Sequence, residues 1–319
     1  MRQPRQRANL LVILRPLMRM LATLVVASFL IFSILALLPG DLAAFLASRS
    51  NTKPSEESLA AIRDQFGLND PLLQRYGDWL AGALRADFGE SWLTGAPVAD
   101  LIAQRIGPTL LLGVSIFLLG SAITFLWGGF AALRPGRLAD HALTLLAILG
   151  TTLPGFVLGL LAIRVFASGL GWASVIGDGT PRTVALPALI GAIGLSSYWA
   201  RPFRALVAEA LASEWALAAR ARGLTETRLL FRHALPNALL GFLPFLGIGL
   251  AGTLTGTILI ETVFSWPGLG AFVIDAIKRR DLPVVQAFAV LAVGFYVTTT
   301  ALADLAATIL SPKMGHAGT

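Results

Sequence analysis

The chain contains no cysteine, and it has only three histidines, His141, His233 and His316. The absence of cysteine excludes disulfides, thiolate nucleophiles and cysteine-ligated metals. The histidines are widely spaced, and none has a partner at the spacing that metal ligands need. We therefore expect no metal site and no catalytic residue. Charge is also scarce, since 13% of the residues are charged while 55% are hydrophobic.

A soluble domain with so few charges would lack the charged surface that it needs. The hydrophobic residues instead occur in uninterrupted runs longer than a core helix requires. These runs predict an all-α integral membrane protein. Because a helix needs roughly 20 apolar residues to cross the bilayer, they predict about six spans, near 17–38, 108–132, 141–166, 184–206, 238–260 and 284–309. We interpret the first as a retained helix rather than a signal peptide, because its apolar stretch is long and no clean cleavage site follows.

Basic residues are distributed unevenly between the connecting segments. If the amino terminus is cytoplasmic, arginines gather on that side before the first span, between the second and third, and between the fourth and fifth. The opposite segments carry a small excess of acidic residues. Cationic segments resist translocation, so both termini are expected in the cytoplasm. The net charge of +7 is then a topology signal and requires no nucleic-acid partner.

The spans divide the chain into four parts. Residues 1–38 hold the cytoplasmic tail and the first span, and residues 39–107 are too long for a tight connection. Residues 108–309 form a five-helix core with a cytoplasmic loop at 207–237, and residues 310–319 form a second cytoplasmic tail.

Residues 39–107 are expected to fold as a small helical subdomain outside the membrane. After a break at Gly67–Pro71, apolar residues follow the spacing of one helix face, at Leu72, Leu73, Tyr76, Trp79 and Leu80. The subdomain is either a spacer or a docking surface for a component that delivers substrate.

The loop at 207–237 predicts two short helices. Alanine, leucine and arginine favour a helix from Glu209 to Arg222, and Gly223 supplies the left-handed conformation that ends it. Thr225 can cap the next helix, which is expected to stop near Pro236 because a proline ring cannot continue it. Such a pair gives a protein partner a rigid element to grip.

The same loop resembles a known family. Ala218-Ala219, three residues, Gly223, nine residues and His233-Ala-Leu-Pro236 resemble the EAA motif of binding-protein-dependent ABC-transporter permeases. Leu217 and His233 replace the glutamate and isoleucine of the general form. The branch that imports dipeptides, oligopeptides and nickel has a similar relaxed motif. Further matches to this branch are Leu38-Pro-Gly-Asp41, Asp87-Phe-Gly89, Glu261-Thr-Val-Phe-Ser-Trp-Pro-Gly-Leu-Gly270 and Arg279-Arg-Asp-Leu-Pro283.

The resemblance implies a type I ABC importer permease in a bacterial inner membrane. Such a permease pairs with a second permease and two ATP-binding subunits, and it receives peptides, nickel or metal chelates from a periplasmic binding protein. It moves them to the cytoplasm by alternating access. The resemblance also implies that ATP and Mg²⁺ bind the partner subunits. This chain lacks the G-x-x-x-x-G-K-[ST] phosphate loop, and we expect it to be no enzyme and to hold no cofactor.

Two sets of residues are candidates for these roles. The ATPase-coupling set is Glu214, Ala218, Ala219, Arg220, Arg222, Gly223, His233, Leu235 and Pro236. The second set lines either the translocation path or the interface between permeases, and comprises Gly249, Thr253, Gly256, Thr257, Glu261 and Asp304. Small residues at this spacing also suit ordinary helix packing, and the arginines also follow from their cytoplasmic position.

Two other functions fit the membrane class. An ion-driven secondary transporter usually shows internal repeats and charged residues at mid-membrane, which this chain lacks. A membrane enzyme such as an intramembrane hydrolase needs Ser-His or paired carboxylates within its spans, and neither arrangement is found.

Overall fold

The computed structural model of the protein describes residues 4–37, 47, 55–65 and 67–310. These residues form helices joined by turns, and their β-structure is limited to an isolated bridge between Glu90 and Pro97. The prediction of an all-α protein is therefore confirmed. The match at Leu38–Asp41 and the tail after residue 310 lie outside the described residues.

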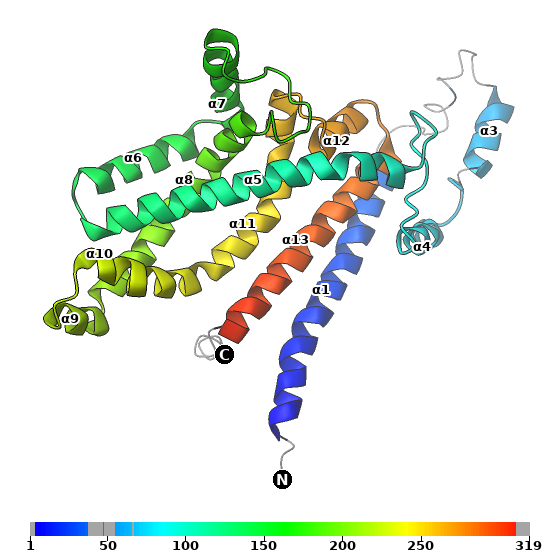
Figure 1. The fold of residues 1–319 in the computed structure, drawn as a ribbon. Coiled ribbons are helices and arrows are strands. Elements are labelled where there is room, and N and C mark those ends of the chain that lie inside the picture. The colour runs from blue at the N-terminus through cyan, green and yellow to red at the C-terminus, as the bar shows by residue number, and fades with distance from the viewer. Residues whose placement is uncertain (1–3, 38–46, 48–54, 66, 311–319) are drawn as a thin grey trace. The chain divides into compact units, whose positions relative to one another are not determined.

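The helices appear in chain order in Figure 1. They are α1 (Pro4–Ala36), α3 (Glu56–Gln65), α4 (Leu72–Ala83), α5 (Val98–Leu133), α6 (Leu138–Thr152), α7 (Gly155–Ala162), the π-helical η1 (Ile163–Gly169), α8 (Ala185–Ala212), α9 (Glu214–Ala221), α10 (Glu226–Leu229), the π-helical η2 (Leu230–Ala234), α11 (Leu235–Val263), α12 (Leu269–Lys278) and α13 (Leu282–Leu310).

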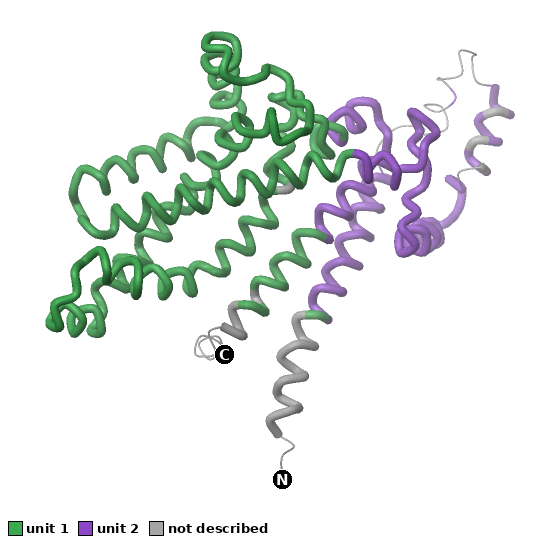
Figure 2. The backbone as a smooth tube through the Cα atoms, viewed as in Figure 1, with its two compact units in different colours: residues 1–17, 105–272, 295–319 green, residues 18–104, 273–294 purple. Residues whose placement is uncertain are grey.

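The chain forms two compact units, which Figure 2 colours separately. The larger unit comprises residues 1–17, 105–272 and 295–319. The smaller unit comprises residues 18–104 and 273–294, so it joins segments that are far apart in the sequence.

By length and composition alone, fewer helices qualify as membrane spans than the six that the sequence runs predicted. Within the described residues, four stretches are long and apolar enough, namely Leu17–Ala36, Val98–Leu133, Glu226–Thr253 and Leu282–Ala303. A fifth is possible if the bent pair α6 and α7–η1 counts as one span. The predicted span 184–206 forms helix α8 but does not reach the same apolar character, because Ser196, Ser197, Tyr198 and Arg201 interrupt it.

The predicted span 141–166 is not one straight helix. Helices α6 and α7 meet at an angle of 99°. Leu153 is extended, with φ −76° and ψ 126°, and Pro154 follows it. A proline disfavours the helical conformation of the residue before it, so the single continuous span was wrong at this point.

The core of the larger unit holds α8 against α11 through aromatic rings. Phe203 and Phe242 are fully buried, with ring centroids 5.1 Å apart. Trp199 meets Phe242 edge to face at 5.6 Å. Arg204 of α8 also forms an ion pair with Asp140 of α6, so α8 is held to α11 by packing and to α6 by charge.

Candidate functional site

The coupling segment, residues 207–237, begins as an extension of α8. That helix continues to Ala212, and Ser213 is extended, with φ −68° and ψ 159°. Helix α9 then starts at Glu214 rather than at the predicted Glu209. The expectation of a helix break at Gly223 is confirmed, because its φ is +83°, which a glycine adopts without steric cost.

The second helix of the segment starts as predicted but does not end as predicted. The Thr225 hydroxyl accepts a hydrogen bond from the Arg228 amide at 3.4 Å, so the predicted cap is present. The chain then runs through α10 and η2 directly into α11, past Pro236. Pro236 has no amide to donate, and the π-helical turn before it changes the hydrogen-bond register, so the helix does not stop there.

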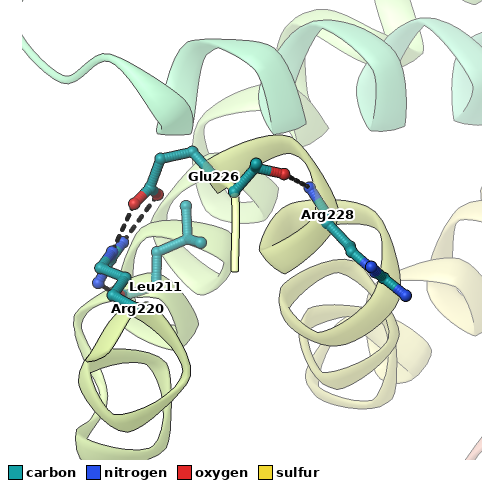
Figure 3. A network of polar contacts seen from close by, with 5 residues as sticks. Leu211, Arg220, Glu226 and Arg228 are labelled. Carbon is teal, nitrogen blue, oxygen red and sulfur yellow. Dashed lines mark hydrogen bonds and ion pairs between the residues drawn. The ribbon is translucent and has the colours of Figure 1, made fainter. Parts of the chain in front are cut away.

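Arg220 ties the segment together (Figure 3). Its Nε and Nη2 donate to the two carboxylate oxygens of Glu226, at 2.6 and 2.9 Å. Its Nη1 donates to the carbonyl of Leu211 at 2.8 Å. The bond to Glu226 raises the pKa of the Arg220 guanidinium. One side chain thus links the end of α8, helix α9 and the start of α10, while Arg228 points away from the pair.

The segment has a buried face that anchors it. Four of its apolar side chains are at most 1% exposed and pack into the aromatic core of the larger unit, at Ala216, Leu229, Leu230 and Ala234. Ala219 and Leu235 pack against the same core and are partly buried. The rings of Trp215 and His233 lie 6.2 Å apart and connect α9 to η2.

The remaining surface of the segment, called its exposed face below, is apolar and basic. Trp215, Leu217 and Phe231 are 39%, 59% and 50% exposed. The coupling candidates Glu214, Ala218, Arg222, Gly223 and Pro236 are exposed too, as are Arg228 and Arg232. Beside Trp215, a groove of about 260 Å³ runs between α8, α9 and α11 and is lined by Glu209, Ser213 and Asn237. This face is a surface that a second protein could contact.

Comparison with known proteins identifies the family. The profile described as "Binding-protein-dependent transport system inner membrane component" matches residues 124–316, and the profile of the N-terminal part of these membrane components matches residues 10–113. The chain belongs to this family. It is a permease subunit of an ABC importer, multi-pass in the inner membrane, and the alternative of an ion-driven transporter is excluded.

Named relatives are similar to this permease over most of its length. It is 37% identical to "Probable peptide ABC transporter permease protein y4tP" of Sinorhizobium fredii, over 95% of this chain and 99% of the relative. It is 33% identical to "Glutathione transport system permease protein GsiC" of Escherichia coli, over 86% of this chain and 89% of the relative. Its fold is similar to the inward-facing MetNI methionine ABC transporter, with a TM-score of 0.50 at 19% identity over 66% of this chain and 94% of that chain.

The second set of candidates, except Asp304, lies along α11 of the permease. Gly249 is buried, and a Cβ at that position would overlap the ring of Trp199. Thr253 is 6% exposed and donates to the carbonyl of Leu250 at 2.7 Å. Thr257 is fully buried, whereas Gly256 is exposed and has open space beside it.

One candidate, Glu261, lies in a network that sequence reasoning missed. Its side chain is fully buried, and its Oε1 accepts from the Thr109 hydroxyl at 2.8 Å. Its Oε2 accepts from the Ala271 amide at 3.0 Å, in the first turn of α12. Thr109 also accepts from the Leu269 amide at 2.7 Å. Thr109 is 152 residues before Glu261, so no local spacing could have indicated the pair.

The turn between α11 and α12 is packed around this network. A Cβ at Gly268 would overlap the Glu261 carboxyl and the Thr109 hydroxyl. Trp266 is fully buried, and its indole donates to the Pro108 carbonyl at 3.0 Å. The observed contacts of Glu261 are therefore those of an anchor between α5, α11 and α12. For Asp304, position 304 belongs to α13, but its side chain lies outside the described residues.

Proposed function

We propose that this permease couples ATP-driven motion of partner subunits to its membrane helices through the exposed face of the coupling segment. The segment is anchored on one side by buried apolar residues and presents Leu217, Phe231 and arginines on the other. A rigid element of this kind transmits a push or pull to α8 and α11, with which it is continuous or tightly packed. The tie from Arg220 to Leu211 and Glu226 is the observation that carries the proposal, because it makes the element stiff.

The remaining assignments follow from that role. Two ATP-binding subunits, which hold ATP and Mg²⁺ and hydrolyse the nucleotide, contact the segment from the cytoplasm. A second permease completes the membrane pathway, and a periplasmic binding protein delivers the substrate. The termini lie in the cytoplasm and residues 39–107 lie outside. Among the members of the second set whose burial is described, Gly256 is exposed on α11 and has the surface that an interface or pathway needs.

The substrate that we propose is a short peptide or a peptide-like molecule. The names of the two relatives, a peptide and a glutathione permease, favour this class over nickel chelates. This assignment is tested by reconstituting the transporter with its binding protein and measuring the uptake of a labelled dipeptide, labelled glutathione and a nickel chelate. Uptake of the nickel chelate alone would contradict it.

A pair of matched variants tests the coupling surface. Leu217→Asp places a charge on the exposed apolar face, whereas Leu138→Asp makes the same change at an exposed leucine at the start of α6. Neither side chain is in the core, so both variants should insert into the membrane. We expect L217D to lose co-purification with the ATP-binding subunits and ATP-dependent uptake, and L138D to retain both. Full assembly and uptake by L217D would refute the coupling role.

The orientation is tested separately. Because the chain has no cysteine, Thr227→Cys gives a single reactive thiol at an exposed position of α10. A membrane-impermeant thiol reagent is expected to label it in inside-out vesicles and not in right-side-out vesicles. The reverse pattern would place the segment outside and remove its access to ATP-binding subunits.

A further inference from the structure

Helix α4 leaves an apolar strip uncovered. Leu73 is 71% exposed, and Leu84, the residue after the helix, is 81% exposed. At 3.6 residues per turn, Leu73, Leu80 and Leu84 lie within about 40° of one another around the helix axis. Asp78 lies about 140° from Leu73 and is exposed as well. The helix therefore has one apolar side, only part of which is covered by the rest of the smaller unit.

The covered part of that side packs on α1. The Tyr76 and Ser28 hydroxyls are 2.8 Å apart, and the Tyr76 hydroxyl also donates to the Val25 carbonyl at 3.3 Å. The Tyr76 ring meets Phe29 edge to face at 5.1 Å. The rings of Phe32 and Trp79 are 6.0 Å apart. These contacts hold α4 alongside α1 within one compact unit.

The position of these contacts on α1 sets the depth of α4. Val25 and Ser28 belong to the stretch Leu17–Ala36, which is long and apolar enough to cross a membrane. Ser28 lies eight residues before Ala36, which corresponds to about 12 Å along a helix. Because the Tyr76 side chain reaches Ser28 at this depth, the backbone of α4 lies close to the boundary of the hydrocarbon.

We propose that α4 is an interfacial helix and that the strip of Leu73, Leu80 and Leu84 is inserted in lipid at the membrane surface. Amphipathic helices that lie in the interface bury their apolar side about 5–10 Å into the boundary between headgroups and acyl chains. The Tyr76 side chain then covers the remaining distance to Ser28, which it contacts with its terminal hydroxyl. Tyrosine and tryptophan gather at this level in membrane proteins, and α4 carries Tyr76 and Trp79. The polar side, with Asp78, then faces water.

The strip favours lipid over a protein partner. α1, on which α4 packs, has its own exposed apolar residues Val25, Val26, Leu30 and Ile34, which lie within the stretch that is long and apolar enough to cross the membrane. The strip on α4 contains no charged residue. A lipid surface covers both with no additional component.

Single cysteines test this placement, because the natural chain has none. The test uses the full-length chain with Leu73→Cys or Leu84→Cys, and with Asp78→Cys as the matched control. Each variant is labelled with a nitrobenzoxadiazole fluorophore and reconstituted in nanodiscs of phosphatidylethanolamine and phosphatidylglycerol. Nitroxide attached to the lipid quenches labels in the interface, and iodide quenches labels in water. We expect the labels at 73 and 84 to be quenched at least severalfold more by the nitroxide lipid than by iodide, and the label at 78 to show the reverse order.

Two outcomes would overturn the proposal. Iodide quenching at 73 and 84 equal to that at 78 would mean that the strip faces water. Protection of 73 and 84 from both quenchers would mean that protein covers the strip. Hydroxyl-radical oxidation of the unmodified chain in nanodiscs gives a second measurement that does not depend on the variants. We expect Leu73 and Leu84 to be oxidised less than the exposed Leu138. Equal oxidation of the three leucines would also contradict the placement.

Discussion

Removing the Glu261 carboxyl should destabilise the permease more than any change on its coupling surface. Glu261→Ala leaves the Thr109 hydroxyl and the Ala271 amide without their shared acceptor, in a site that is fully buried. An unsatisfied buried polar group costs about 1–3 kcal/mol. Two such groups amount to about 2–6 kcal/mol, and the cavity left by the missing side chain adds to the loss.

Glu261→Gln isolates the contribution of the contacts from that of the charge. The amide has a similar shape and its oxygen can accept from Ala271, but its nitrogen then faces the Thr109 hydroxyl and cannot accept the proton that Thr109 donates to Glu261. The loss is then about 1–3 kcal/mol for one unsatisfied donor, and it is smaller than that of E261A because a second acceptor is kept and no cavity forms. We expect the order of stability to be parent, then E261Q, then E261A.

The order can be measured on purified protein in detergent. Samples are heated to a series of temperatures, and the fraction that stays monodisperse in size-exclusion chromatography gives a midpoint temperature for each variant. Because unfolding in detergent is irreversible, the order of the midpoints is compared rather than absolute free energies of unfolding. Leu138→Asp, a surface change, serves as the control and should keep the parent midpoint. If E261A matched the parent, or if E261Q fell as far as E261A, the network of contacts would not be the source of the stability.

Three further predictions concern connecting segments. Arg220→Ala should weaken coupled uptake more than Glu226→Ala. Both variants remove the exposed ion pair, which contributes only about 0.2–1 kcal/mol, but R220A also removes the hydrogen bond to the Leu211 carbonyl. Equal losses of uptake would contradict this prediction. Gly223→Ala should lower the midpoint in the same heating assay, and Gly223→Asn should lower it less, because the left-handed conformation at φ +83° costs a residue with a Cβ about 1–2 kcal/mol and asparagine tolerates it better. Hydrogen bonds from the Thr183 and Thr180 hydroxyls lower the pKa of Asp178 from 3.8 to about 2. The ionised Asp178 therefore stabilises the loop of residues 178–183 fully above pH 3.8, and this stabilisation is lost as the pH falls through 2. Hydrogen exchange of this loop, corrected for intrinsic rates, should increase over that range, and D178N should abolish the dependence.

The coupling segment shows which local features could be predicted from the sequence. The break at Gly223 and the cap at Thr225 were correct, because a left-handed turn and a side-chain cap depend on a few neighbouring residues. The end near Pro236 was wrong, because the π-helical turn before it carries the helix past the missing amide. The partner of Arg220 was not predicted, since Glu226 comes close only after the chain reverses at Gly223.

The sequence by itself determined the helical membrane class and the family, because apolar runs set the number of residues that lipid can cover and the EAA-like spacing is local. Only the tertiary structure decided that Glu261 meets Thr109, that Trp199 fills the space beside Gly249, and that Tyr76 reaches into α1. Such contacts join residues far apart in the chain. Hydrophobicity requires these side chains to be covered but does not specify by what, and that choice is made by shape and hydrogen bonding when the helices pack.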